Sequence, residues 1–384
     1  MTLTESVATA FKAKFERSPL LFVAPGRINL IGEHTDYNDG FCMPAAIDKH
    51  FVFAIARNGT EQFNLYASDF DSSVSFAMAD VKKGAHWYNY LMGVIHGIQQ
   101  QGHSLTGIDC VFGGNIPPGA GLSSSAALCC GFGFALNKIF ELGLTNIEIA
   151  RIAQYAEHHF VGLMCGIMDQ YSSLFGKENA AMLLDCRSVT HEYLPFQSDD
   201  IEILLIDSKV KHELASSAYN DRRASCERGV EVIQLQNPEV RSLRDVSRIM
   251  LRENKQRMGE DVFQKCSFIV EEIERTRAAA LSLNRKNLED FGRLMFEAHE
   301  GISKLFDVSC EELDVLVDIA RSNPQMVIGA RMMGGGFGGC TVNLVKKTHT
   351  HAFKEEVRKR YFTAFKREPD FHFVKLSAGV HQVA

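Results

Sequence analysis

Several features that would assign a function class directly are missing from this sequence. Its ten cysteines form no CxxC pair, and in a chain of 384 residues this scatter favours reduced core cysteines over a disulfide framework or a zinc site. No segment approaches the roughly 20 apolar residues that a membrane-spanning helix needs. No GxxxxGK[ST] sequence occurs, so the chain lacks the phosphate-binding motif of P-loop nucleotide-binding proteins. We therefore expect neither a membrane protein nor a P-loop enzyme.

Charge of one sign is not concentrated anywhere along the chain. The formal net charge is −6, and the 41 lysines and arginines are not gathered into long runs. Binding to nucleic acid or to an acidic membrane surface needs a positive field, so neither is expected as a partner. The first 19 residues include Glu5 and lack the apolar stretch of a signal peptide, which predicts a cytoplasmic protein.

Length and periodicity predict an α+β protein of two domains. A chain of this length with 46% hydrophobic residues can bury a large core. Short strands bounded by turns dominate the first part, and long helices dominate the second part before a final strand, turn, strand, helix and strand. Because no low-complexity linker separates the two parts, we place the boundary by pattern, giving domains 1–185 and 186–384.

The most informative stretch is GGNIPPGAGLSSSAA, residues 113–127, which leads into an apolar helical pattern. Gly119 and Gly121 let the backbone approach an anion, and the unpaired N–H groups and dipole at the start of a helix favour phosphate. A serine here can ligate a nucleotide's magnesium ion. We place Ser125 at the cap of this turn. A plain helix start with a serine cap is the alternative.

A second glycine-rich stretch, residues 332–342, contains a formal G-x-G-x-x-G at Gly334, Gly336 and Gly339. A dinucleotide fingerprint should open a helix, but the residues that follow, CTVNLV, are typical of a strand. We therefore expect a turn between two strands, either one at which the backbone approaches another group closely or a simple tight hairpin.

Polar residues are unusually dense between residues 27 and 39. Carboxylate and imidazole groups set side by side suit a polyhydroxylated ligand, because carboxylates accept hydrogen bonds from sugar hydroxyls and histidine can donate or accept. A solvated turn is the alternative, and His34 alone would more often be structural. Taken alone, Asp169 would be a helix N-cap and Glu157 a surface charge. The residues of this cluster are Arg27, Asn29, Glu33, His34, Thr35, Asp36, Tyr37, Asn38 and Asp39.

Taken together, these blocks resemble the GHMP small-molecule kinases and, within them, the galactokinase family. PGRINLIGEHTDYNDG at residues 25–40 is similar to the galactokinase signature, and GAGLSSSAA at 119–127 is similar to the superfamily's phosphate loop. MGGGFGGC at 333–340 is similar to its third motif. CGIMDQ at 165–170 and SAYNDRR at 217–223 resemble further galactokinase segments.

The resemblance implies a fold, a reaction and its ligands. The fold would pair an N-terminal domain of the ribosomal S5 domain 2 type with a ferredoxin-like C-terminal domain, and the active site would lie in the cleft between them. The reaction would be transfer of the γ-phosphoryl group of ATP, with Mg²⁺, to the anomeric hydroxyl of D-galactose. We expect a monomer. Alternatives are a non-catalytic galactose- and ATP-binding regulator, a kinase for N-acetylgalactosamine, or a dehydrogenase built on the second glycine stretch.

The resemblance also assigns roles to individual residues. Asp169 would accept the proton of the sugar hydroxyl, and Arg27, close to it, would stabilise developing charge. Ser125 and Glu157 would hold the metal. The residues expected to contact the sugar are Glu33, His34, Thr35, Asp36, Gly166, Asp169 and Tyr219. Those expected to bind ATP are Ser68, Trp87, Gly119, Ala120, Gly121, Leu122, Ser123, Ser124 and Ser125.

Overall fold

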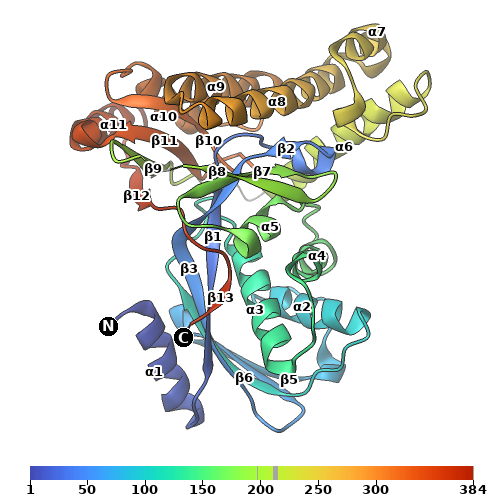
Figure 1. Cartoon of the computed structure of the whole chain (residues 1–384), viewed down its shortest axis with the longest axis vertical. Coiled ribbons are helices and arrows are strands. Elements are labelled where there is room, and N and C mark those ends of the chain that lie inside the picture. The colour runs from blue at the N-terminus through green and yellow to red at the C-terminus, as the bar shows by residue number, and fades with distance from the viewer. Residues whose placement is uncertain (197, 211–214, 384) are drawn as a thin grey trace.

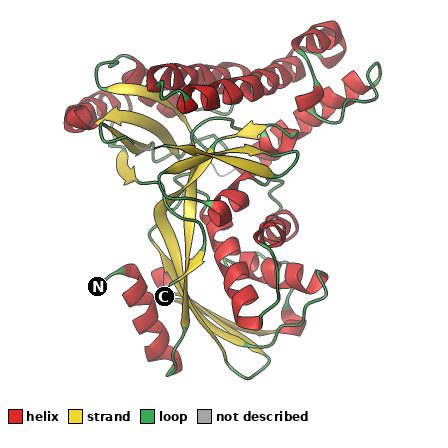
Figure 2. Cartoon of the chain, in the orientation of Figure 1, coloured by secondary structure: helices red, strands yellow, loops and turns green. Residues whose placement is uncertain are grey.

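The computed structural model describes residues 1–196, 198–210 and 215–383, which form two lobes stacked along the long axis of the molecule (Figure 1). Helices and strands mix in both lobes, which confirms the α+β class (Figure 2). None of the helices in these ranges is both long enough and apolar enough to cross a lipid bilayer.

The lobe that contains both termini is built on a mixed six-stranded sheet. Its strand order is β13-β1-β3-β6-β4-β5, and only the pairing of β4 with β6 is parallel. The two long central strands extend from this sheet towards the other lobe (Figure 1). The strands are β1 (Leu20–Asn29), β3 (Pro44–Arg57), β4 (Gln62–Ala67), β5 (Ser72–Ala77), β6 (Ile108–Gly114) and β13 (His381–Gln382).

Helices cover both faces of this sheet. Helix α1 (Leu3–Phe15) begins at the Thr2–Glu5 capping box and packs Val7 and Phe11 on one face. The other face is covered by a larger group whose apolar residues join the main core of the lobe. That group consists of α2 (Asn89–Gln100), α3 (Ser124–Phe140), α4 (Asn146–Ala156) and α5 (Met168–Phe175).

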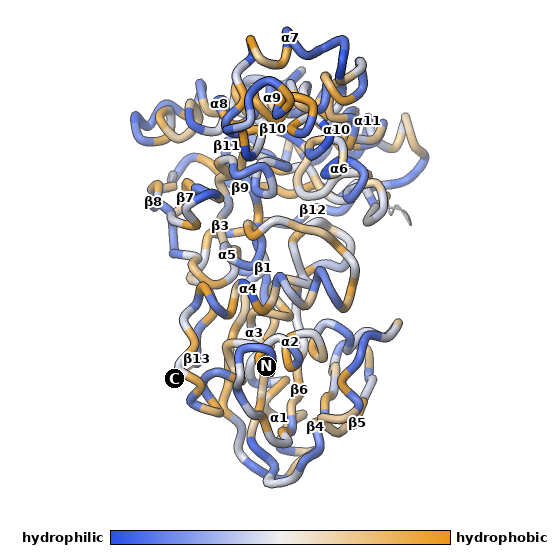
Figure 3. The backbone as a smooth tube through the Cα atoms, turned by 90° about the vertical axis from the view of Figure 1, so that its right-hand side faces the viewer, coloured by the Kyte–Doolittle hydropathy of each residue, from blue (hydrophilic) through white to orange (hydrophobic). Residues whose placement is uncertain are grey.

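The second lobe is built on a four-stranded antiparallel sheet of order β10-β11-β9-β12. Hydrophobic and hydrophilic residues are interspersed along its helices (Figure 3), as expected for helices that bury one face. The strands are β9 (Ile201–Asp207), β10 (Val327–Met332), β11 (Cys340–Lys346) and β12 (Asp370–Val374). The helices that pack on it are α9 (Leu288–Gly301), α10 (Glu311–Arg321) and α11 (Thr350–Phe365), and α8 (Glu260–Asn284) lies against α9.

Smaller elements connect the lobes. A three-stranded sheet of β2 (Phe41–Cys42), β7 (Ala180–Asp185) and β8 (Thr190–Pro195) lies between them, and α6 (Ala215–Gln234) and α7 (Arg248–Met258) project to one side (Figure 1). After β12 the chain returns to the first lobe, where β13 pairs with β1. One hydrophobic cluster contains residues of both lobes, such as Ile28 and Val342, so the lobes share a core. The division at residue 185 stays a prediction.

Local sequence signals agree with the structure at both glycine stretches. Helix α3 begins directly after the first stretch, and β11 follows the second, as expected. The cap of α3 differs from our expectation, because the N-cap is Ser123 and not Ser125. Ser123 has a positive φ of 55° and makes no side-chain cap bond, since its hydroxyl is used by a carboxylate of another segment. The ten cysteines are free thiols, as predicted.

Candidate active site

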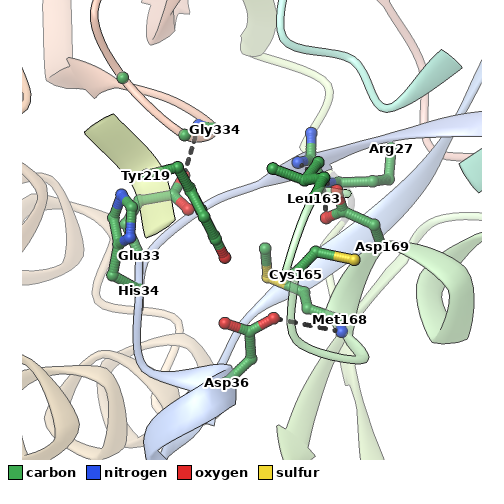
Figure 4. A pocket seen from close by; sticks show the side chains of 12 residues that line it. Arg27, Glu33, His34, Asp36, Leu163, Cys165, Met168, Asp169, Tyr219 and Gly334 are labelled. Atoms are coloured by element: carbon green, nitrogen blue, oxygen red, sulfur yellow. Dashed lines mark hydrogen bonds and ion pairs between the residues drawn. The ribbon is translucent and has the colours of Figure 1, made fainter. Parts of the chain in front are cut away.

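A pocket of about 270 Å³ lies where segments of both lobes meet (Figure 4). It is walled by the end of β1, the loop after it, the segment 163–169, helix α6 and the turn between β10 and β11. In Figure 4, Tyr219 and Asp36 face Asp169 and Cys165 across this space. The lining residues are Arg27, Glu33, His34, Asp36, Leu163, Cys165, Met168, Asp169, Tyr219, Gly334, Gly335 and Gly336.

Asp169 is held by two segments at once. It lies in the first turn of α5, and Arg27 of β1 donates to both of its oxygens, from Nε at 2.6 Å and from Nη2 at 3.0 Å. The Ser123 hydroxyl donates to Oδ2 at 2.5 Å. Burial by itself would lower the pKa of Arg27, but the negative charges of Asp169 and Glu33 raise it. Arg27 is therefore a fixed cation beside a fixed carboxylate.

Asp36 is a second carboxylate in the same pocket. Burial raises its pKa to about 6, and the neighbouring charge of Asp169 acts in the same direction. Its Oδ2 accepts a hydrogen bond from the Met168 backbone N–H at 3.4 Å. Gly166 is packed against this carboxylate, and a Cβ at that position would overlap it. Gly166 thus allows the chain to pass Asp36 closely, and its expected contact with sugar stays a prediction.

Glu33 connects the two lobes. Its Oε1 accepts from Arg331 Nη2 at 2.6 Å and from the Gly334 N–H at 2.8 Å. Arg331 also donates to the carbonyls of Leu30 and Asn29, each at 2.8 Å, and its side chain is fully buried. Because a buried charge needs a partner and satisfied hydrogen bonds, this arrangement fixes both the Glu33 carboxylate and the second glycine turn.

His34 and Tyr219 form an aromatic wall of the pocket. Burial lowers the pKa of His34 to about 4, so the ring is neutral at pH 7, and its Nδ1 bonds to the Tyr37 hydroxyl at 2.7 Å. The ring centroid of Tyr219 lies 5.0 Å from that of His34. Thr35, which we expected to contact the sugar, does not line the pocket, because its side chain points into its own loop. Its hydroxyl donates to the Gly32 and Phe41 carbonyls at 2.9 and 2.7 Å, which closes the loop on itself.

The first glycine stretch has the backbone shape of an anion-binding turn. Gly119 and Gly121 have positive φ values of 79° and 73°, which side chains rarely adopt. Helix α3 begins at Ser124, so its first N–H groups are available at this turn. The side chains of Ala120 and Leu122 are buried, so only their backbone could reach a phosphate group.

Ser125 and Glu157 meet beside this turn. The Ser125 hydroxyl donates to Glu157 Oε2 at 3.1 Å, and Gln170 Nε2 donates to Oε1 at 2.8 Å. Burial, reinforced by the charge of Asp169, raises the pKa of Glu157 to about 7. A divalent cation would compensate such a buried carboxylate, and a carboxylate with a hydroxyl is a donor set that suits Mg²⁺.

This pair fits a metal that is shared with a nucleotide. Within the described ranges, no group of three or more His, Cys, Asp or Glu residues could hold a metal ion by itself. Mg²⁺ is usually bound through one or two carboxylates together with substrate phosphates, and one carboxylate with one hydroxyl next to the first glycine stretch fits that pattern.

The two residues expected at the adenosine end lie outside the pocket, around Phe112. Trp87 packs its ring 5.7 Å from that of Phe112 and donates to the Ser72 hydroxyl at 3.0 Å. Ser68 donates to the Phe112 carbonyl at 3.0 Å. The structure thus brings Ser68 and Trp87 to the same neighbourhood, and their contact with ATP stays a prediction.

Sequence reasoning gave no role to several residues of this site. Cys165 and Met168 line the pocket within the recognised segment CGIMDQ, so their neighbours could have indicated them. Leu163 and Arg331 carried no signal of that kind. Arg331 is separated from Glu33 by 298 positions, and only the fold reveals the contact.

Comparison with known proteins agrees with this geometry. The galactokinase galactose-binding signature matches residues 9–57, the N-terminal domain of GHMP kinases matches 89–177, and the C-terminal domain of GHMP kinases matches 278–363. The chain is 38% identical to the galactokinase of Thermotoga neapolitana over 360 residues, which cover 94% of this chain and 99% of that protein.

Solved structures show the same fold. The galactokinase of Lactococcus lactis complexed with galactose superposes with a TM-score of 0.96 at 30% identity, covering 100% of both chains. The mevalonate kinase of Methanococcus jannaschii superposes with a TM-score of 0.65 at 19% identity, covering 94% of this chain and 98% of that one, which speaks for the fold alone.

The two-lobed fold, with a glycine turn at the start of α3 and a pocket between the lobes, and the matches to both GHMP kinase domains define a GHMP kinase. The match to the galactose-binding signature and the identity along nearly the whole chain narrow this class. The protein belongs to the galactokinase family.

Proposed function

We propose that this protein is a galactokinase that transfers the γ-phosphoryl group of ATP to the anomeric hydroxyl of D-galactose and releases α-D-galactose 1-phosphate and ADP. The observation that carries the proposal is the position of Asp169. Its carboxylate accepts hydrogen bonds from Arg27 in the pocket and from Ser123 in the first glycine stretch, which supports a role between the proposed sugar and phosphate sites. Family membership makes galactose the expected sugar.

In the proposed mechanism, Asp169 accepts the proton of the anomeric hydroxyl as the oxygen attacks the γ-phosphorus and the bond to the β-phosphate oxygen breaks. The transition state of phosphoryl transfer is loose, so positioning and electrostatics dominate. Arg27 fixes both oxygens of Asp169 by its two hydrogen bonds and places a positive charge beside the reacting groups. The sugar would be oriented by hydroxyl contacts to Glu33 and Asp36.

The phosphate end is served by the first glycine stretch. The N–H groups at the start of α3 and the backbone around Gly119 and Gly121 would hold the triphosphate and stabilise the ADP leaving group. Ser125 and Glu157 would hold Mg²⁺, which, when bound, neutralises charge on the phosphate oxygens. We further propose that the protein is monomeric and cytoplasmic.

The alternatives are less well supported. A non-catalytic regulator that binds galactose and ATP is disfavoured by the complete GLSSSAA turn and by the presence of Asp169. N-acetylgalactosamine differs from galactose only at C2, and a sugar panel is needed to test it.

A coupled assay of ADP release tests the function. Purified protein is given ATP, Mg²⁺ and one sugar at a time from galactose, N-acetylgalactosamine and glucose, with a sugar-free blank. We expect galactose to give the highest kcat/KM. No ADP above the blank with any sugar would refute the enzyme, and a preference for N-acetylgalactosamine would refute the assigned substrate.

A further inference from the structure

One wall of the sugar pocket is a loop that belongs to no helix or strand. Residues 162–165 lie between the short π-helix Glu157–Val161 and helix α5, and Leu163 and Cys165 of this loop line the pocket. The loop leads directly into Gly166 and then Asp169. Its position therefore affects both the shape of the pocket and the approach to the proposed base.

The two ends of the loop are held by the lobe that contains them. The N–H groups of Gly162 and Leu163 donate to the Glu157 carbonyl at 2.8 and 3.1 Å. The Cys165 carbonyl is within hydrogen-bond distance of His158 Nε2 at 2.8 Å and accepts from Gln154 Nε2 at 3.2 Å. These contacts leave the middle of the loop, Met164, to be held by something else.

Helix α6 holds that middle part with two side chains. The Met164 N–H donates to Asn220 Oδ1 at 3.1 Å, and Asn220 Nδ2 donates to the Gly162 carbonyl at 3.2 Å. The Met164 carbonyl accepts from Arg223 Nη1 at 3.0 Å. The Asn220 amide thus bonds to the loop backbone as a neighbouring strand would, with one donated and one accepted hydrogen bond.

The same helix carries the opposite wall of the pocket. Tyr219 precedes Asn220 and lines the pocket, with its ring centroid 5.6 Å from that of Tyr37. The Arg223 guanidinium lies 5.8 Å from the Tyr37 ring centroid. Asn220 and Arg223 therefore join the wall formed by Leu163 and Cys165 to the aromatic wall, from positions that are 56 and 59 residues distant from Met164.

We propose that Asn220 and Arg223 are positioning residues that clamp the loop 162–165 against α6 and thereby determine the affinity for the sugar; this rests on the sugar-kinase function proposed above. Neither residue lines the pocket, so both act through the loop. Without the clamp, Met164 loses its partners on α6, and the loop that carries Leu163 and Cys165 is held against the bound sugar only from its own lobe. The phosphate turn is built from other segments and stays unchanged.

The first test replaces Asn220 by leucine, which has a similar size and forms neither hydrogen bond. We expect Asn220→Leu to raise the KM for galactose about tenfold, the effect of losing two neutral hydrogen bonds, while the KM for ATP stays unchanged. Asn220→Asp keeps the oxygen that accepts from Met164 and should fall between wild type and Asn220→Leu. Asp221→Ala, an exposed neighbour on the same helix, is the matched control and should behave as wild type.

The second test addresses Arg223. Arg223→Met keeps the aliphatic stem without the guanidinium and should raise the galactose KM several-fold, whereas Arg223→Lys should recover part of the loss. Arg223 also pairs with Glu227 at 2.9 Å, so Glu227→Gln separates that surface ion pair from the loop contact and should leave the galactose KM unchanged.

Hydrogen–deuterium exchange provides a readout that needs no activity. A peptide covering residues 162–166 should exchange faster in Asn220→Leu than in wild type and equally in Asp221→Ala, because the Met164 N–H loses its acceptor. If wild type lacks kinase activity, the proposed function fails while this exchange difference still tests the clamp. Equal exchange in wild type and Asn220→Leu, or an equal rise of both KM values, would overturn the clamp.

Discussion

The sugar pocket and the phosphate turn lie next to each other and are built in opposite ways. The phosphate turn is one continuous stretch, residues 119–125, and its shape comes from positive φ angles and the start of a helix. The sugar pocket combines segments that are far apart in the chain, and one of its fixing contacts, Arg331 to Glu33, spans 298 positions. Under the proposed function, nucleotide binding would therefore depend on local backbone geometry and sugar binding on the packing of the two lobes.

The largest effect is expected at Asp169, where the two regions meet. Asp169→Asn keeps the size of the side chain but cannot accept the sugar's proton, so kcat should fall by a factor of about 10³ to 10⁴. Galactose and MgATP should both still bind, as measured by calorimetry, with thermal unfolding as a control for folding. A kcat within tenfold of wild type would mean that the base lies elsewhere.

A change at Glu157 should affect the phosphate side alone. Glu157→Gln removes the carboxylate proposed to hold the metal, and we expect kcat to fall about 100-fold while the KM for galactose stays unchanged. A larger effect on galactose than on ATP would break the separation between the two regions.

Glu157→Gln should lower activity but raise the stability of the folded protein. Burial raises the pKa of Glu157 from 4.5 to about 7, so the folded protein binds this proton more tightly than the unfolded chain does. The resulting loss of stability is therefore absent below about pH 4.5, grows as the pH rises from 4.5 to about 7, and levels off above that. Without nucleotide at pH 8, Glu157→Gln should be more stable than wild type by roughly 1 to 3 kcal/mol in denaturant unfolding, and the gain should shrink towards pH 4.5.

A change at Asp36 should affect the sugar pocket alone. Asp36→Asn should raise the KM for galactose about 10- to 100-fold, because the variant loses a charge-assisted hydrogen bond to the sugar. The KM for ATP should change little. Burial raises the pKa of Asp36 to about 6, so kcat/KM for galactose in wild type should decrease as the pH falls below 6 and this carboxylate is protonated. In Asp36→Asn that decrease should be absent from the pH profile. A change confined to the KM for ATP would contradict the assignment.

The smallest effect is expected from a change in the contact between the lobes. Arg331→Lys keeps a positive charge for Glu33 but gives up part of the hydrogen bonds to Leu30 and Asn29. We expect the galactose KM to rise about threefold to tenfold and the ATP KM to stay the same. An ATP effect as large as the galactose effect would show that the phosphate turn also depends on this contact.

The parts of the molecule that the sequence predicts are those set by neighbouring residues. The helix that begins at Ser124 and the strand after Gly339 follow from patterns within a few positions, and the structure contains both. The prediction of Ser125 as the cap of α3 was wrong because a tertiary contact decides the cap. The Ser123 hydroxyl donates a hydrogen bond to Asp169, 46 positions away.

The sugar pocket shows where such reasoning ends. Glu33 and Asp36 belong to a dense polar stretch and could be proposed as ligands from it, with the family resemblance deciding between a sugar site and a solvated turn. Leu163 and Asn220 have no such signal, because an apolar residue in a loop and an asparagine on a helix are ordinary. Their roles follow from contacts between segments that pattern analysis cannot pair.

The most direct test of the central claim is to locate the transferred phosphate. Protein, MgATP and D-galactose are incubated, and the products are followed by ³¹P NMR. The account predicts ADP and one sugar phosphate whose ³¹P signal is split by the anomeric proton, and no such signal without the protein. Phosphate on another hydroxyl, or release of inorganic phosphate alone, would contradict it.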